Sequence, residues 1–134
     1  MSTSSVKYLG GLRTESTHIQ SGSKILTDAP TDNHGKGEAF SPTDMVANSL
    51  ATCMLTVMGI KADSLGVDFL GATANVTKVM GVEPRRIIKI QIEFIMEVKV
   101  DDKTKIILER TANTCPVLES LHPELEKDVT FKWL

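Results

Sequence analysis

The fold of this chain is decided by SPTDMVANSLATCMLTVMGIKADS (residues 41–64). Ser41 is a preferred helix N-cap residue, and Pro42 suits the first helical position. The stretch therefore predicts a helix that starts at Pro42 and ends between Ala62 and Ser64. Its apolar side chains point in nearly every direction around the helix axis. Such a helix is buried on most sides, either inside the fold or at a subunit interface.

Strand patterns flank this helix on both sides. Short strands are predicted within residues 5–28, another over 70–76, and a last one over 129–133. The clearest pattern is the alternation of apolar and polar residues over 88–100. It predicts one long, half-buried strand of roughly 43 Å, at ~3.3 Å per residue.

Two further helices are predicted before the last strand. Asp101 and Asp102 are suited to start a helix that runs to about Asn113, and a short helix is expected from Pro116. The resulting order is strands, helix, strands, helices and a strand. It predicts an α+β fold in which antiparallel sheets cover buried helices, with residues 1–134 forming one domain.

The composition is that of an ordinary globular domain. The chain has 134 residues, of which 41% are hydrophobic and 24% charged, and its formal net charge is −2. The chain has no surplus of basic residues that would indicate a nucleic acid or an acidic membrane surface as a partner. We see no secretory signal pattern, and the most apolar stretch, 45–60, is shorter than the roughly 20 residues of a membrane span. We therefore expect a soluble, cytoplasmic protein.

The two cysteines lie in different local sequences. Cys53 is in the middle of the predicted central helix, where a small buried apolar residue is the simpler interpretation. Cys115 precedes Pro116 at a predicted helix start, where backbone N–H groups and the helix dipole lower a thiol pKa and favour the thiolate. In a reducing compartment, two cysteines are not by default a structural disulfide. A redox pair is one interpretation, but the sequence alone does not show that the two residues meet.

No metal or cofactor site is expected. The histidines His18, His34 and His122 have no metal-ligand spacing to each other or to the cysteines. The methionines lie mostly in apolar stretches, so that core packing is their expected role.

Two motifs resemble those of a known family. FSPTDMVANSLATCM (residues 40–54) and NTCPV (residues 113–117) resemble the two cysteine motifs of the OsmC/Ohr family, the osmotically inducible and organic hydroperoxide resistance proteins. The resemblance extends from about Tyr8 to Trp133, with the motifs in the family's order. The two motifs together are specific, whereas either one alone is not.

The resemblance implies an intertwined homodimer of OsmC-like fold, with long central helices enclosed by sheets and active sites at the subunit interface. It also implies a cysteine-based peroxidase for oxidative stress defence. By match to the motifs, Cys53 attacks an organic hydroperoxide and becomes a sulfenic acid. Cys115 then forms a disulfide with it, and a dithiol reductant resets the pair.

The resemblance further implies supporting residues around the cysteines. The family uses an arginine on an early glycine-rich loop, and GGLR (residues 10–13) is the matching stretch, which makes Arg13 the candidate. An ordinary exposed loop arginine is the alternative. The hydroperoxide-resistance branch has a glutamate directly after the helix-opening proline, where this chain has Thr43. The acid follows one position later as Asp44, as in other branches of the family.

Asp44 also suits a purely structural role, as a negative charge at a helix N-terminus. It lies nine positions before Cys53 on the same predicted helix. The two side chains would therefore lie on opposite faces and about 13 Å apart along the helix axis. If Asp44 acts on a cysteine, it must do so across a dimer interface.

Two rival hypotheses come from other functional classes. The first is a non-enzymatic dimeric OsmC-like module that binds a small hydrophobic ligand at the subunit interface, and Thr43 in place of glutamate favours it slightly. The second is a hydrolase with a cysteine nucleophile, which lacks a convincing histidine partner.

Overall fold

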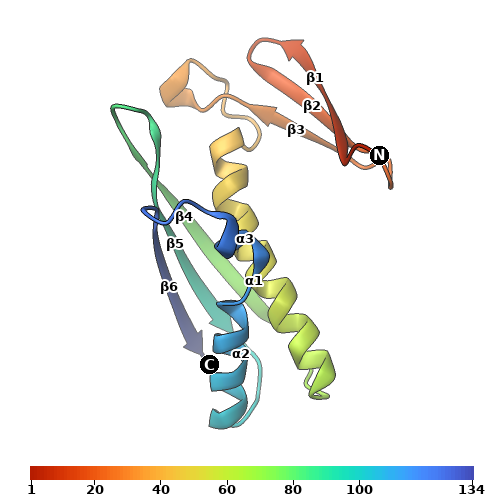
Figure 1. Ribbon diagram of the computed structural model, residues 1–134, viewed down its shortest axis with the longest axis vertical. Helices are drawn as coiled ribbons and strands as arrows, with labels where there is room; N and C mark the ends of the chain where they lie inside the picture. The colour runs from red at the N-terminus through yellow and green to blue at the C-terminus, as the bar shows by residue number, and fades with distance from the viewer. The chain divides into compact units, whose positions relative to one another are not determined.

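The computed structural model describes residues 1–134 (Figure 1). Its strands and helices, in chain order, are β1 (Ser4–Gly10), β2 (Arg13–His18), β3 (Lys24–Asp28), η1 (Thr31–Asn33), α1 (Pro42–Ser64), β4 (Ala72–Gly81), β5 (Arg86–Met96), α2 (Asp102–Ala112), α3 (Pro116–Ser120) and β6 (Glu126–Trp133). The chain divides into two compact units, Met1–Val46 and Ala47–Leu134. The predicted α+β class is confirmed.

The first unit contains the antiparallel sheet β1-β2-β3. In the tight turn between β1 and β2, Gly10 and Gly11 have φ angles of 85° and 61°, which glycine adopts without the strain that a side chain would add. β2 therefore starts directly at Arg13. The register of β2 and β3 pairs Arg13 with Asp28.

The sheet of the first unit leaves most of its apolar side chains exposed. The buried residues of this unit are Thr27, Asp28 and Ser41, all of them polar. By contrast, Val6 and Tyr8 in β1 are each 63% exposed. A sheet of three strands needs a covered hydrophobic face to be stable in water. The first unit therefore has an apolar surface that needs a partner.

The second unit contains the sheet β4-β5-β6, with α1, α2 and α3 beside it (Figure 1). β4 and β5 form an antiparallel pair, as predicted, but β6 runs parallel to β5. The expectation of purely antiparallel sheets is therefore wrong for this pair. The physical reason is the connection: α2 and α3 lie between the two strands, and a helical crossover returns the chain to the same end of the sheet.

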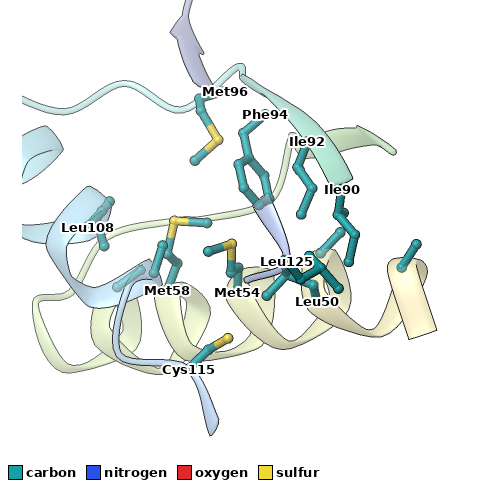
Figure 2. Close-up of a cluster of buried hydrophobic side chains, with 14 residues drawn as sticks. Leu50, Met54, Met58, Ile90, Ile92, Phe94, Met96, Leu108, Cys115 and Leu125 are labelled. Carbon is teal, nitrogen blue, oxygen red and sulfur yellow. The ribbon is translucent and has the colours of Figure 1, made fainter. Parts of the chain in front are cut away.

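The core of the second unit lies between α1 and the sheet. Figure 2 shows Leu50, Met54 and Met58 of α1 facing a row of β5 side chains. That row consists of the alternate residues Ile90, Ile92, Phe94 and Met96, all of them fully buried. Every second side chain of β5 thus faces the core from one side of the sheet, as the alternation in the sequence predicts.

The long strand predicted over 88–100 is shorter in the structure and ends at Met96. The chain then leaves the sheet and starts α2, where the Asp101 side chain accepts a hydrogen bond from the N–H of Thr104 as the N-cap. Val98 is still buried although it lies outside the strand. The apolar alternation therefore continues past the end of the strand because the connection also contributes to the core.

Helix α1 has the predicted bounds, Pro42–Ser64. By length and composition it could cross a membrane, which the shorter apolar stretch did not predict. The helix at the centre of a protein core meets the same criteria, and α1 contributes Leu50, Met54 and Met58 to the core. Its opposite side remains open in the single chain, where Ile60 is 66% exposed.

Candidate functional site

Cys53 lies in the middle of α1 and is half-buried. Its side chain packs against the edge of the hydrophobic core. On either side of it, Thr52 is exposed and Met54 is fully buried. Cys53 is thus at the boundary between the buried and open sides of the helix. A thiol at this boundary has both the packing of a core residue and access to solvent.

Cys115 is fully buried and forms the N-cap of α3. Its Sγ accepts a hydrogen bond from the backbone N–H of Leu118 at 3.3 Å. Pro116 follows as the first helical residue, where its missing N–H costs nothing. The predicted position of Cys115 at a helix start is therefore confirmed.

The side chain of Cys53 lies close enough to that of Cys115 to affect the pKa of the Cys115 thiol. Burial is the largest effect on Cys115 and raises the pKa of its thiol; the hydrogen bond from the Leu118 N–H lowers it, and the neighbouring Cys53 sulfur raises it again. The net direction is upward. The prediction that the helix start favours a Cys115 thiolate is therefore wrong, because desolvation of the charged form outweighs the backbone hydrogen bonds.

The two cysteines are therefore neighbours, but they form an unequal pair. Both are free thiols, one half-buried and the other fully buried. A buried thiol with a raised pKa is a poor first nucleophile, because the thiolate is the reactive form. A half-exposed thiol beside it can meet a small molecule from solvent. The arrangement suits oxidation at Cys53 followed by disulfide formation with Cys115.

Arg13 lies at the start of β2, not in the loop where the resemblance placed it. Its guanidinium donates two hydrogen bonds to the carboxylate of Asp28, from Nε to Oδ1 at 2.7 Å and from Nη2 to Oδ2 at 2.9 Å. The Oε2 atom of Glu38 lies 3.5 Å from Nη2. The alternative of an ordinary exposed loop arginine does not describe this residue.

Asp28 is the most deeply buried ionisable partner of this cluster, with its side chain 1% exposed. Besides the two bonds from Arg13, its Oδ2 accepts a hydrogen bond from the backbone N–H of Glu38 at 3.1 Å. Hydrogen bonding to Arg13 is the main cause that holds the pKa of Asp28 below its ordinary value. Sequence reasoning missed Asp28. The signal that could have found it is the β2–β3 register, which places an acid opposite Arg13.

Asp44 belongs to a capping box at the start of α1. Its Oδ2 accepts a hydrogen bond from the backbone N–H of Ser41 at 3.0 Å, and the Ser41 Oγ accepts one from the N–H of Asp44 at 3.0 Å. This reciprocal arrangement satisfies two N–H groups at the helix start. The structural role expected for Asp44 is therefore present.

No group of three or more His, Cys, Asp or Glu side chains is placed to hold a metal ion. His18 instead forms a hydrogen bond with Ser21, through Nδ1 at 2.6 Å. His122 accepts one from the backbone N–H of Glu124 at 3.0 Å, also at Nδ1. These histidines have local roles in turns.

Comparisons with known proteins place these features in context. Residues 35–130 match the family model described as OsmC-like protein. A crystal structure from Psychrobacter arcticus 273-4, of a protein provisionally described as an osmotic stress induced and detoxification response protein, is 53% identical, with a TM-score of 0.94 over 98% of this chain and 96% of that one. No curated protein matches the chain.

More distant structures share the fold. An OsmC-like protein from Mycoplasma pneumoniae is 16% identical, with a TM-score of 0.81 over 98% of this chain and 95% of that one. An organic hydroperoxide resistance protein OsmC from Legionella pneumophila, also described as a predicted redox protein, is 15% identical, with a TM-score of 0.71 over 98% of each chain. At these identities the likeness shows the fold alone.

Proposed function

Because this chain belongs to the OsmC-like family, we propose that it is a thiol-dependent peroxidase that reduces organic hydroperoxides. The observation that carries the proposal is that the half-exposed Cys53 and the buried Cys115 are neighbours of unequal burial. The name of the Legionella pneumophila structure, an organic hydroperoxide resistance protein, agrees with this substrate class.

The proposed reaction has three steps. The Cys53 thiolate attacks one oxygen of the hydroperoxide, the O–O bond breaks, and the other oxygen leaves as an alcohol after taking a proton. Cys53 is then a sulfenic acid. The Cys115 thiol attacks the Cys53 sulfur, a disulfide forms, and water leaves. Finally, a dithiol reductant returns both cysteines to thiols by exchange and is itself oxidised to a disulfide.

The raised pKa of Cys115 supports this division of roles. A second thiol that stays protonated does not compete for the peroxide, and it carries the proton that must leave with the water of the condensation step. Its burial also keeps it away from other oxidants. Cys53 is the better placed of the two to meet a substrate.

Arg13 is the proposed source of positive charge in this chemistry. Charge develops on the leaving oxygen as the O–O bond breaks, and a guanidinium stabilises it. We propose that Arg13 acts on the peroxide at the Cys53 site, and that Asp44 contributes from the partner subunit. The capping box that Asp44 forms with Ser41 already accounts for its local position.

A homodimer is the proposed working form, with each chain contributing a single OsmC-like domain. Two surfaces support it: the exposed apolar side chains of the first sheet, such as Val6 and Tyr8, and the open side of α1 around Ile60. Light scattering on the purified protein should give twice the chain mass of 14.6 kDa. A monomer at micromolar concentration would contradict this part of the proposal.

The test of the function is peroxide turnover by the wild-type protein with dithiothreitol as the dithiol reductant. We expect repeated turnover of cumene hydroperoxide and slower turnover of hydrogen peroxide, because an organic group can be bound at an apolar dimer interface. The alternative, a module that only binds a hydrophobic ligand, predicts no consumption above that of dithiothreitol alone. The proposed setting is oxidative stress defence in the cytoplasm, where dithiol reductants are available.

A further inference from the structure

We propose that α3 (Pro116–Ser120) is a redox-sensitive cover over Cys115: the helix is capped and closed while Cys115 is a thiol, and its first turn opens when Cys115 is joined to Cys53 in a disulfide. The inference rests on the proposed redox pair and extends it to the step in which a reductant must reach the disulfide. It concerns Cys53, Cys115 and α3, all of which belong to the unit Ala47–Leu134.

The Cys115 sulfur caps the start of α3. Its Sγ accepts a hydrogen bond from the backbone N–H of Leu118 at 3.3 Å, and Cys115 has the extended backbone of an N-cap residue, with φ −68° and ψ 139°. Ser, Thr, Asp and Asn are the usual residues at this position, because their side-chain oxygen satisfies an N–H group that the helix leaves unpaired. Here the acceptor is the sulfur of a proposed redox cysteine. The stability of α3 therefore depends on the chemical state of Cys115.

The helix α3 is too short to be stable by itself. It contains five residues, far fewer than the roughly 12–15 at which an isolated helix becomes marginally stable in water. Two of its backbone hydrogen bonds, from Glu119 to the Cys115 carbonyl and from Leu121 to the Leu118 carbonyl, are long at 3.3 Å. Its apolar side chains Val117 and Leu118 are only partly buried against the core. Loss of the cap should therefore be enough to open the first turn.

The chain before Cys115 is held more firmly. The Thr114 backbone N–H donates to the carbonyl of Thr111 at 3.0 Å, and the Thr114 hydroxyl donates to the same carbonyl at 2.7 Å. The Asn113 side chain also donates to the Glu109 carbonyl, at 3.2 Å. These bonds anchor the residues before Cys115 to α2. A displacement of the Cys115 sulfur is therefore transmitted to α3 rather than to α2.

A disulfide changes both the position of the Cys115 sulfur and its strength as an acceptor. Cys53 lies on α1, close enough to affect the pKa of the Cys115 thiol. A bond between the two sulfurs must adopt the specific distances and dihedral angle of a disulfide, which draws the Cys115 Sγ towards α1 and away from the N–H of Leu118. The sulfur can also no longer ionise, and the ionised form is the stronger acceptor. Because a partly buried N–H without a partner is costly, the first turn of α3 opens and water replaces the sulfur.

Opening of α3 gives a reductant access to the disulfide. In the structure both cysteines are free thiols, and Cys115 is fully buried. Burial protects Cys115 from oxidants, but it also blocks one side of the disulfide, and exchange requires that the attacking thiolate reach a sulfur. A cover that opens only after oxidation exposes the disulfide to the dithiol reductant and protects Cys115 at other times.

The experiment is residue-resolved amide hydrogen exchange, measured by NMR on the wild-type protein, with Thr104 as the internal control. Leu118 and Thr104 each follow the N-cap of their helix by three residues, but the Thr104 N–H is bound at 2.8 Å by the Asp101 carboxylate, which a thiol oxidant does not change. The disulfide is formed with diamide, which takes up the two hydrogens of the thiols. We expect Leu118 to exchange about tenfold faster in the oxidised protein, the scale of a lost helix cap, and Thr104 to be unchanged.

Cys115→Ala and Cys115→Ser form a matched pair of variants, neither of which can form the disulfide. Serine keeps an acceptor at the N-cap, whereas alanine does not. We expect Leu118 to exchange about tenfold faster in Cys115→Ala than in Cys115→Ser without any oxidant. One equivalent of cumene hydroperoxide oxidises only Cys53 in Cys115→Ser, so it should leave the exchange rate of Leu118 unchanged.

The outcomes separate the cover from the peroxidase function. An oxidised protein that has lost about 2 Da to the disulfide but exchanges Leu118 at the reduced rate overturns the inference alone. Equal Leu118 rates in Cys115→Ala and Cys115→Ser also overturn it, as does faster exchange in peroxide-treated Cys115→Ser. If diamide forms the disulfide and loosens Leu118 but cumene hydroperoxide forms no disulfide, the proposed function is wrong and the cover stands. If neither oxidant joins Cys53 to Cys115, both are wrong.

Discussion

Replacing Cys53 with serine should lower the rate of cumene hydroperoxide turnover by about 1,000-fold or more, the scale expected when an enzyme loses its nucleophile. A serine hydroxyl is not ionised at neutral pH and cannot form a sulfenic acid. The buried Cys115 should not substitute for it, because burial raises the pKa of its thiol. The measurement is the rate of peroxide consumption in the presence of dithiothreitol, monitored with a colorimetric hydroperoxide assay.

The Cys115→Ser variant tests the second step of the reaction and is compared with Cys53→Ser. It removes the resolving thiol but leaves the half-exposed Cys53 in place. We expect it to consume one equivalent of peroxide rapidly and to leave a Cys53 sulfenic acid that reacts with dimedone. Turnover by Cys53→Ser at the wild-type rate would show that Cys53 is not the attacking residue. A Cys115→Ser variant that forms no dimedone adduct would contradict the order of the two steps.

Replacing Phe94 with alanine should have the largest effect on stability. Phe94 is fully buried in β5, and its ring stacks on that of Phe131 with the centroids 5.1 Å apart. Loss of such a side chain costs about 3–5 kcal/mol, through lost transfer free energy and the cavity that remains. That is a large part of the roughly 5–15 kcal/mol that stabilises an ordinary domain. Urea unfolding followed by circular dichroism would measure the change.

The control for Phe94→Ala is Ile88→Ala on the same strand. Ile88 is 37% exposed, so its truncation removes less buried surface and leaves no closed cavity. We expect it to cost less than half as much free energy of unfolding as Phe94→Ala. Equal losses in the two variants would show that the row of buried β5 residues is not the centre of the core.

The central helix could be predicted from sequence because its signals are local. Ser41 and Pro42 define its start, and the observed capping box with Asp44 uses those same residues. The alternation along β5 was equally visible, although the strand stops at Met96 where the chain turns towards α2. The parallel placement of β6 was missed because strand direction depends on the crossover through α2 and α3, which no local pattern encodes.

The site was harder to predict because its features depend on contacts between distant residues. The position of Cys115 before a helix could be predicted, but the direction of its pKa shift could not, because the sequence does not show that the thiol is fully buried. Asp28 was missed for the same reason. Its carboxylate becomes significant only through the register that pairs it with Arg13. The proximity of the two cysteines likewise comes from the fold.

The central claim is that Cys53 and Cys115 are a peroxide-driven redox pair, and mass spectrometry after one equivalent of cumene hydroperoxide tests it most directly. Disulfide formation within one chain removes two hydrogens, so we predict a loss of about 2 Da per chain and a single crosslinked peptide pair that contains Cys53 and Cys115. Dithiothreitol should reverse the change. Unchanged mass with both thiols free, or a stable oxygen adduct on Cys53 with no crosslink to Cys115, would contradict the account.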